Sequence, residues 1–382
     1  MAGLPEHRFT DKDLWGKDGR PGADDVQQQS IGDCYLVSAA GVVAQQTPDL
    51  IRNNIEFNEA TGEFAVRLYQ GDHWQRVPVT QAELTNNLSE RGGSSFGSKT
   101  PDAGGGLWPA IYEVAYAKMR WNDWETGLQQ LAKGGNPADA LHAITGEEPI
   151  RLDAAQVKEM GMQATVMRIN DALAHDKRVV MGTNKDPKGA SELWEALVSR
   201  TGYKTDGVTG HHAYMVLGAR YDEASGEAVI TLRNPWGHNR GIDPSLGPGK
   251  GAEVEVKLNE LLQENTRSFG TFHIGMLEPQ QQGLFEAIQR QVGDKAGDAA
   301  VALASVQASR EGITSTDQLR MAAVTDDGKL WVAGKTEGYR TMVDTLAALP
   351  SREESLGQLA QEAQRLQVAS SQAPEPPARQ LA

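Results

Sequence analysis

The 382-residue chain lacks several features that would place it in common protein classes. It contains one cysteine, Cys34, which excludes an intramolecular disulfide. It has no apolar run that approaches the length needed to span a bilayer. Residues 1–22 are polar and lack the basic-then-apolar pattern of a secretory signal peptide. We therefore expect a protein that is cytoplasmic when made and has no membrane span.

An excess of basic residues is also missing. The net charge of −14 argues against a sequence-independent grip on nucleic acid, so no nucleic-acid partner is expected. The EF-hand pattern of acidic ligands is absent, and the scattered histidines show no ligand spacing to Cys34. The sequence therefore requires no cofactor and gives no support for a calcium site. With 39% hydrophobic and 23% charged residues, the composition is that of a globular protein of two or three domain-sized units.

The single cysteine stands in a setting that suits a nucleophile. Residues 28–36 read Gln-Gln-Ser-Ile-Gly-Asp-Cys-Tyr-Leu, and the apolar, alanine-rich stretch 35–44 predicts a helix with Cys34 in its first turn. A thiol there faces unpaired backbone N–H groups and the positive end of the helix dipole, and both favour the thiolate. On the local sequence alone, a small buried residue that happens to be cysteine is an equal alternative.

A histidine and an asparagine that suit such a nucleophile stand far downstream. His212 enters a strand-like run at residues 213–217, and Asn234 closes a second strand at residues 228–232. Because sequential strands usually pair, we expect His212 and Asn234 to lie side by side with the helix of Cys34 opposite. The chain order Cys, His, Asn is that of papain-like proteases.

Two further residues belong to this arrangement. Gln28, six residues before Cys34, is placed to donate its amide N–H to an oxyanion together with the backbone N–H of Cys34. His211 competes with His212, because neighbouring side chains on a strand point to opposite faces and only one can face a cleft. The pattern Gly-x-His-Ala-Tyr favours His212 and leaves His211 in the loop that approaches the strand.

The residues together resemble a known family, the calpain family of cysteine proteases. The resemblance covers about residues 8–278, and its blocks fall in the family order. The segments that carry it are Gln28…Gly32-Asp33-Cys34, Gly210-x-His212-Ala213-Tyr214 and Arg233-Asn234-Pro235-Trp236-Gly237, with residues 107–119 and 252–275 as further similar blocks.

The resemblance implies a role for each site residue. Cys34 would be the nucleophile, His212 the base and acid, Asn234 the group that orients the imidazole, and Gln28 the oxyanion donor. Trp236 would shield the hydrogen bond between the histidine and the asparagine from water.

The resemblance also implies an α+β fold, a papain-like two-lobed cysteine protease followed by a small C-terminal α/β accessory domain. The expected domains are a polar lead-in at 1–22, a helical lobe with the nucleophile helix at 23–135, a lobe with an antiparallel sheet carrying the histidine and asparagine at 136–278, the accessory domain at 281–369 and a disordered tail at 370–382. Expected strands lie at 64–69, 164–168, 179–183, 213–217, 229–232, 254–257 and 271–276, and residues 91–106 are expected to form an exposed Ser/Gly loop.

The sequence departs from the family pattern at two places. Tyr35 follows the cysteine where the family commonly has tryptophan, so an aromatic ring is kept. After Gly237, residues 238–241 read His-Asn-Arg-Gly in place of an acidic, tryptophan-containing stretch. That tryptophan acts as a wedge in the calcium-dependent animal enzymes, so the resemblance does not support calcium dependence here.

The region after residue 280 has a different, glutamine-rich texture. We expect helices at 283–292 and 298–312, a hairpin at 321–333 turning through Asp-Asp-Gly, and a helix at 351–368. This arrangement loosely resembles the C-terminal signal domain of antibacterial type IV secretion effectors. That resemblance implies export into a target cell by a signal-peptide-independent route, with a coupling ATPase and a cognate immunity protein as partners. An accessory or oligomerisation domain is the alternative.

The sequence therefore predicts a calpain-like cysteine endopeptidase that cleaves protein substrates through a Cys-His-Asn triad and a thioester, and that acts as a secreted effector or toxin. Two alternatives stay open. The same triad serves an acyl transferase or deamidase, because an amine can resolve a thioester as well as water. A protease-like adaptor without activity belongs to a different class.

Overall fold

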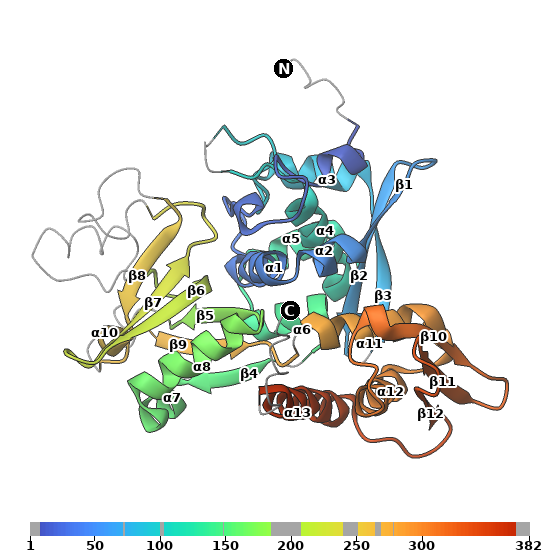
Figure 1. Ribbon diagram of the computed structural model, residues 1–382. Coiled ribbons are helices and arrows are strands. Elements are labelled where there is room, and N and C mark those ends of the chain that lie inside the picture. The colour runs from blue at the N-terminus through green and yellow to red at the C-terminus, as the bar shows by residue number, and fades with distance from the viewer. Residues whose placement is uncertain are drawn as a thin grey trace, which may run out of the picture. The chain divides into compact units, whose positions relative to one another are not determined.

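The computed structural model describes residues 8–71, 73–99, 103–147, 149–184, 208–239, 251–263, 269–277 and 279–371. The chain divides into two compact units, Met1–Gly275 and Met276–Ala382, each with its own helices and sheet (Figure 1). From residue 372 on, the predicted disordered tail lies outside the described residues. The mixed α+β class predicted from the sequence is confirmed.

The first part of unit 1 is mainly helical, with one small antiparallel sheet. Its strands pair in the order β1-β2-β3. The elements are the short 3-10 turns η1 (Asp11–Asp13) and η2 (Ala23–Asp25), helices α1 (Cys34–Gln46), α2 (Pro48–Asn54), α3 (Gln81–Ser89), α4 (Trp108–Trp121), α5 (Trp124–Leu131) and α6 (Pro137–Thr145), and strands β1 (Ile55–Asn58), β2 (Glu63–Gln70) and β3 (His73–Val79).

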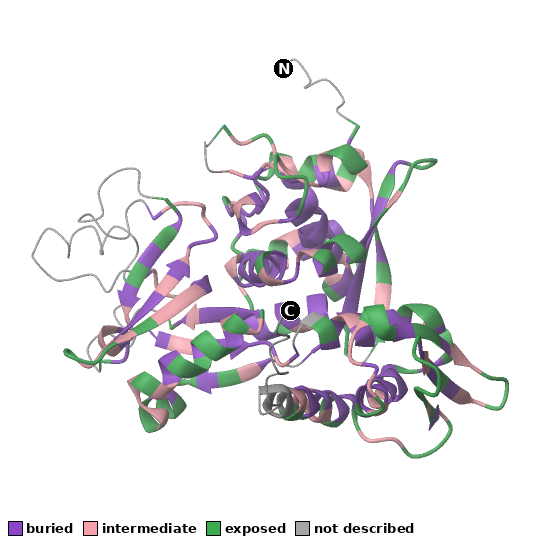
Figure 2. Cartoon of the chain, in the orientation of Figure 1, coloured by how far each residue is buried: buried purple, intermediate pink, exposed green. Residues whose placement is uncertain are grey.

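Helices α1 and α4 form the centre of this part because almost every residue in them is small or apolar. All ten residues from Tyr35 to Ala44 are buried, as are eleven of the residues of α4 (Figure 2). A helix that is apolar all round must lie inside the protein. Asn136 is the N-cap of α6, and Pro137 stands in its first turn.

The second part of unit 1 is built on a six-stranded antiparallel sheet with the order β4-β9-β5-β6-β7-β8. Helix α8 packs on this sheet. The elements are β4 (Ile150–Asp153), α7 (Ala154–Met160), α8 (Met162–Ala174), β5 (Val179–Thr183), β6 (Ala213–Asp222), β7 (Glu227–Arg233), β8 (Glu253–Lys257), α10 (Leu258–Leu261) and β9 (Phe269–Ile274).

Strand β6 carries the contact between the two parts of unit 1. Successive side chains of a strand point to opposite faces. Ala213 and Met215 accordingly join the core that contains α1, whereas Tyr214 and Val216 join the core that contains α8. The hydroxyl of Ser38, on α1, donates to the carbonyl of Ala213 at 3.0 Å, and this buried bond fixes α1 against β6.

Two local predictions are wrong. Residues 164–168 were expected to form a strand because they include Thr and Val, but they lie inside α8. The buried positions of α8, from Thr165 to Ala172, recur at helical spacing and cover one face, and this packing overrides the β propensity of a short window.

The second wrong prediction concerns residues 91–106, which are not simply an exposed loop. Ser94 and Ser95 are buried, and the Ser94 hydroxyl donates to the carbonyl of Gly106 at 2.7 Å. Ser94 also pairs with Val26 in an isolated bridge. This stretch, rich in glycine and serine, therefore packs beneath the segment that leads to α1.

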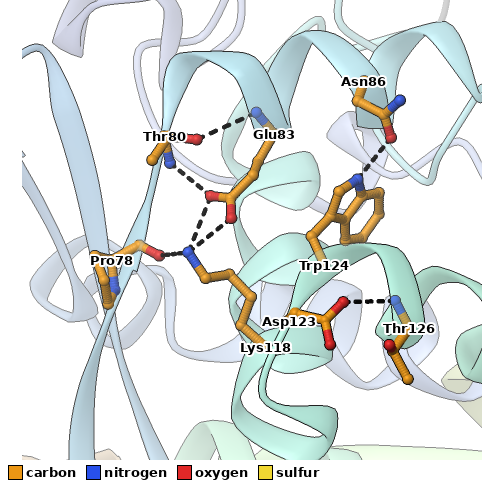
Figure 3. A network of polar contacts seen from close by, with 8 residues as sticks. All are labelled: Pro78, Thr80, Glu83, Asn86, Lys118, Asp123, Trp124 and Thr126. Atoms are coloured by element: carbon orange, nitrogen blue, oxygen red, sulfur yellow. Dashed lines mark hydrogen bonds and ion pairs between the residues drawn. The ribbon is translucent and has the colours of Figure 1, made fainter.

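Helices α3 and α4 are joined by a polar network near one end of α3. Lys118 lies between the Pro78 carbonyl, at 2.6 Å, and the carboxylate of Glu83, which also caps α3 through Thr80 (Figure 3). The Trp124 indole N–H donates to the side chain of Asn86 at 2.6 Å. These contacts hold α3 in place beside α4.

Unit 2 combines helices with a three-stranded antiparallel sheet of order β10-β11-β12. The predicted hairpin turns through Asp326-Asp327-Gly328, where Gly328 has the positive φ of 77° that favours glycine. The third strand was not predicted. The elements are α11 (Pro279–Val292), η4 (Gly293–Lys295), α12 (Asp298–Arg310), η5 (Thr316–Gln318), β10 (Leu319–Val324), β11 (Lys329–Gly334), β12 (Arg340–Asp344) and α13 (Arg352–Ser371).

Candidate active site

Cys34 is the first residue of α1, as the sequence predicts. Asp33 is the N-cap, and its carbonyl accepts the backbone N–H groups of Leu36 and Val37 at 2.8 and 3.2 Å. The cysteine side chain is partly exposed and packs against the core. The N–H groups of Leu36 and Val37 are thus occupied, whereas the backbone N–H of Tyr35 lies close enough to the thiol to lower its pKa.

His212 directly precedes β6 and is fixed by β5. Its backbone N–H donates to the Thr183 hydroxyl at 2.8 Å, and its carbonyl accepts the Thr183 backbone N–H at 2.8 Å. His211 adopts a positive φ of 56° and is exposed, so the chain turns there before it enters the strand. His212, in contrast, is only 7% exposed.

His212 and Asn234 meet because β6 and β7 pair. Met215 lies opposite Arg233 in this pairing, which places the residue before β6 beside the residue after β7. The imidazole Nε2 lies 3.0 Å from the Asn234 Oδ1, and the asparagine is fully buried. The ring centroids of His212 and Trp236 are 4.7 Å apart, so the indole covers the histidine beside its contact with Asn234.

A second asparagine, Asn239, holds the amide of Asn234. The Asn234 Nδ2 donates to the Asn239 Oδ1 at 3.2 Å, while the Asn239 Nδ2 donates to the carbonyls of Gly251 and Glu253 at 3.1 and 3.0 Å. The Asn239 oxygen thus accepts from Asn234, and the Trp236 backbone N–H donates to the Asn234 Oδ1 at 3.1 Å, so both contacts direct the Asn234 oxygen toward His212. In the sequence, residues 238–241 stand out only as a departure from the family pattern, and the contact of Asn239 with Asn234 was not predicted.

Gln28 lies close to the same residues, but its amide points inward. Its backbone N–H donates to the Pro235 carbonyl at 2.7 Å, which ties it to the segment that follows Asn234. Its Nε2 donates to the Ile31 carbonyl at 2.7 Å and to the Asp33 Oδ1 at 3.3 Å. Both hydrogens of Nε2 thus have acceptors, and donation to an oxyanion requires the longer contact, with Asp33, to open.

A cavity of about 390 Å³ brings the predicted site residues together. Gln28, Cys34 and His212 line it, with Tyr35 and Trp236 beside them. Asn234 is not part of the lining and supports His212 from behind. The opposite wall includes residues 132–135, which follow α5.

Burial favours the neutral forms of both Cys34 and His212. Burial raises the pKa of the Cys34 thiol to about 12, a hydrogen bond with the Ala213 backbone opposes this rise, and charge on Asp33 adds to it. Burial lowers the pKa of His212 to about 4, against the smaller effect of its hydrogen bond with Asn234. Burial thus opposes the preference for the thiolate that is expected at the start of a helix, and it is the largest cause of the raised pKa of Cys34.

Metal ligands do not gather in the described part of the chain. Among those residues, no three side chains of His, Cys, Asp or Glu lie close enough to hold an ion together. Within the same residues, none of the helices has the length and apolar character to cross a bilayer.

The chain is similar to known cysteine proteases. Residues 10–281 match the family model described as calpain family cysteine protease. A thiol protease of Porphyromonas gingivalis is 24% identical over 221 residues, which are 56% of this chain and 44% of that protein. Calpain-13 of Rattus norvegicus is 28% identical over 225 residues, which are 56% of this chain and 29% of that protein. The chain thus spans less than half the length of these relatives.

Proposed function

Because the chain belongs to the calpain family of cysteine proteases, we propose that it is an endopeptidase that hydrolyses protein substrates with Cys34 as its nucleophile. The observation that carries the proposal is the buried contact of 3.0 Å between His212 and Asn234. It lies behind a cavity that Cys34 and His212 both line. A nucleophile, a base and a group that orients the base are the parts that covalent acyl transfer requires.

The proposed reaction begins with transfer of the thiol proton. Asn234 occupies the Nε2 of His212, so Nδ1 is the nitrogen that accepts the proton of Cys34 as sulfur attacks the peptide carbonyl. The backbone N–H of Cys34 and the amide of Gln28 would stabilise the oxyanion that forms. His212 then gives its proton to the leaving amine, and a thioester remains on Cys34.

Water completes the cycle. His212 removes a proton from water, whose oxygen attacks the thioester carbonyl, and the proton returns to sulfur as the carboxylic acid leaves. Because the resting thiol and imidazole are both neutral, proton transfer and carbon–sulfur bond formation occur together. Trp236, beside the imidazole, would keep water from the contact between His212 and Asn234.

We also propose that unit 1 is a papain-like pair of lobes. The helical part around α1 would be the lobe of the nucleophile, and the six-stranded sheet would be the lobe of His212 and Asn234. Support comes from the two cores that β6 separates.

The experiment that tests the function compares the purified chain with its Cys34→Ala variant on an unfolded protein substrate. We expect new amino termini from the wild type and a loss of at least about a thousandfold in rate from the variant, because single triad members contribute that much or more. Equal cleavage by the two proteins would contradict the proposal. Transfer of the acyl group to an added amine, or release of ammonia without chain cleavage, would identify the acyl transferase or deamidase. An unreactive Cys34 and no product of either kind would identify an adaptor.

For unit 2 we propose a role in export to a target cell, by docking on a coupling ATPase. The support is that unit 2 is compact by itself and contains none of the proposed catalytic residues. A cell that makes such a protease would need an immunity protein that blocks the cleft of Cys34.

The test of the export proposal compares, in the producing cell, the full chain with a chain that ends at residue 278. We expect the shorter chain to keep peptidase activity and to stay inside the cell. A shorter chain that is exported as well would contradict the proposal.

A further inference from the structure

Two buried carboxyl groups lie beneath the nucleophile. Asp33 caps α1 directly before Cys34, and Glu113 projects from α4, which packs against α1. Both side chains have no exposed surface. Asp33 and Glu113 are in hydrogen-bond contact with each other. Burial of two acidic groups in contact needs a reason, because a carboxylate without compensation is strongly destabilised in the interior.

The partners of the four carboxyl oxygens are unequal. The Glu113 Oε2 accepts the Asn87 side chain at 3.1 Å and the Gly93 backbone N–H at 2.8 Å. The Asp33 Oδ1 accepts the Gln28 amide at the longer distance of 3.3 Å. The remaining oxygens, Oδ2 of Asp33 and Oε1 of Glu113, are buried and receive no hydrogen from another residue of the described chain. A proton held between the two carboxyls supplies what both of these oxygens lack.

Electrostatics places that proton on Asp33. Burial raises the pKa of Asp33 well above its usual range, and the charge and hydrogen bond of Glu113 raise it further. Burial also raises the pKa of Glu113, but hydrogen bonds from Asp33, Gly93 and Asn87 oppose that rise. Two carboxyls at one site do not ionise together, so the better-solvated partner carries the charge.

Resting on the function proposed above, we propose that Asp33 and Glu113 form a proton-sharing pair, neutral at Asp33 and charged at Glu113, that positions the oxyanion donor Gln28 and keeps negative charge away from Cys34. The pair would thus connect α4 to the chemistry through α1. Asp33 and Glu113 are positioning residues, since neither lines the cavity.

The neutral state of Asp33 has two effects on the reaction. A carboxylic acid oxygen is a weaker acceptor than a carboxylate oxygen, so Gln28 can exchange its 3.3 Å contact for an oxyanion at smaller cost. A charged Asp33 raises the pKa of the Cys34 thiol, and the neutral form removes this obstacle to sulfur attack. Besides Glu113, the titratable groups that interact with Asp33 are Cys34 and Tyr35. The neutral Asn87 and Gly93, from α3 and the neighbouring loop, contact Glu113.

The test uses two isosteric variants with opposite expected effects. In Glu113→Gln, the new amide can donate to Asp33 and accept from Gly93. The charge of Glu113, which adds to the effect of burial on the pKa of Asp33, is then gone and a donor has been added, so Asp33 ionises more readily. In Asp33→Asn, the new side chain imitates the neutral Asp33 and leaves Glu113 charged. Glu83→Gln is the matched control, because Glu83 also joins α3 to α4 but belongs to the separate network of Figure 3.

The main measurement is the rate of Cys34 alkylation by iodoacetamide as a function of pH, which requires no peptidase activity. The profile is recorded between pH 7 and 9, below the midpoint of the thiol, where the rate follows the thiolate fraction. We expect Glu113→Gln to shift this profile upward by about 1 pH unit, a roughly tenfold lower rate at each pH, as for a new charge close to the thiol, while Asp33→Asn and Glu83→Gln cause no upward shift. On a peptide substrate, Glu113→Gln should lower kcat on the order of tenfold, with KM little changed, because Gln28 is held back from the oxyanion.

Other outcomes overturn the proposal. A downward shift in Asp33→Asn with none in Glu113→Gln would place the charge on Asp33, and unchanged profiles in both folded variants would mean that the pair shares no proton that matters to Cys34. If Glu113→Gln does not fold, infrared spectra decide instead. The wild type at pH 7 should show the carbonyl stretch of a buried protonated carboxyl, Asp33→Asn should lose it, and its absence from the wild type would refute the pair. If the chain proves to have no peptidase activity, the alkylation profiles and the spectra still test whether Asp33 and Glu113 share a proton.

Discussion

His212 determines the acid limit of the proposed reaction, because it must be neutral to accept the thiol proton. Its burial lowers its pKa to about 4, compared with about 6.5 for an exposed histidine. The groups around it are Cys34, Asn234 and the rings of Tyr214 and Trp236, none of which carries a charge at neutral pH.

As the pH falls, the reaction should therefore stop only when His212 gains a proton. We expect kcat/KM for a peptide to stay near its neutral value down to about pH 5 and to fall below it, a range set by the lowered pKa of His212. The measurement is kcat/KM between pH 3.5 and 8 at constant ionic strength. An acid limb centred near 6.5 would mean that the histidine is solvated in the active protein.

The choice between the two adjacent histidines is open to a direct test. His212→Ala should abolish turnover, with a loss of at least about a thousandfold. His211→Ala should change it by less than about tenfold, because His211 lines the cavity but does not contact Asn234. Steady-state rates on one peptide decide, and an inactive His211→Ala beside an active His212→Ala would reverse the assignment.

Asn239 has a role that its hydrogen bonds make testable. Asn239→Ala should remove one of the contacts that orient the Asn234 amide and leave the donation from the Trp236 backbone N–H at 3.1 Å, so kcat should fall on the order of tenfold while Cys34 stays open to alkylation. Asn259→Ala is the matched control, because Asn259 also bonds two backbone groups, at Ala228 and Gly226, away from the site. Both variants should lose about 1–3 kcal/mol of stability, measured by denaturant unfolding. Equal kcat for the two variants would refute the role of Asn239.

At the scale of residues, the sequence predicted where the proposed nucleophile, base and orienting group would lie. The positions of Cys34, His212 and Asn234 followed from motif order and from the pairing of two neighbouring strands. Asn239 did not stand out, since its role depends on a loop that folds back toward Gly251. The contact of Asp33 with Glu113 joins residues that are far apart in sequence, and no local sequence pattern predicts it.

At the scale of elements, the wall of the cavity depends on a close approach between α1 and the segment after α5. A Cβ at Gly135 would lie 2.5 Å from the ring of Tyr35, a distance that real Cβ atoms do not tolerate. Tyr35 is itself buried and packs edge-to-face on Tyr116 of α4, so it cannot move aside easily.

Gly135→Ala should therefore displace residues 132–135 from the cavity wall. We expect KM for a peptide to rise by about tenfold or more, and a stability loss of about 1–3 kcal/mol from overpacking. Gly357→Ala in α13 is the control, since a Cβ there meets open space and should increase helix stability by about 0.5–1 kcal/mol. Peptide kinetics and thermal unfolding measure both. A Gly135→Ala protein with unchanged KM would show that the wall adapts.

Elements with strong patterns were predictable, and those set by long-range packing were not. The apolar run of α1 and the Asn-Pro start of α6 were evident in the sequence. The strand expected at 164–168 became part of α8, because the buried positions of this thirteen-residue helix recur from Thr165 to Ala172, a spacing that a five-residue window does not sample. The Ser/Gly stretch at 91–106 became buried because backbone groups of Gly93 and Gly106 find partners in the core.

At the scale of the whole molecule, the division at Gly275 predicts two pieces that survive apart. Boundaries with few crossing contacts are the first places that proteases reach. Brief treatment of the Cys34→Ala protein with subtilisin, a protease of broad specificity, should first give fragments that separate near residues 275–279, as identified by mass spectrometry. Persistence of the intact chain until unit 1 itself is degraded would contradict the division.

The single thiol of this chain lies in the cavity where the substrate would react. Peroxide would convert it to a sulfenic acid, and these 382 residues hold no second cysteine to trap that state as an internal disulfide. Recovery would depend on an external thiol that reaches the cavity, such as glutathione. Further oxidation to the sulfinic acid would be permanent. The redox state of its surroundings would therefore act on this protein as an off switch whose reset comes from outside the chain.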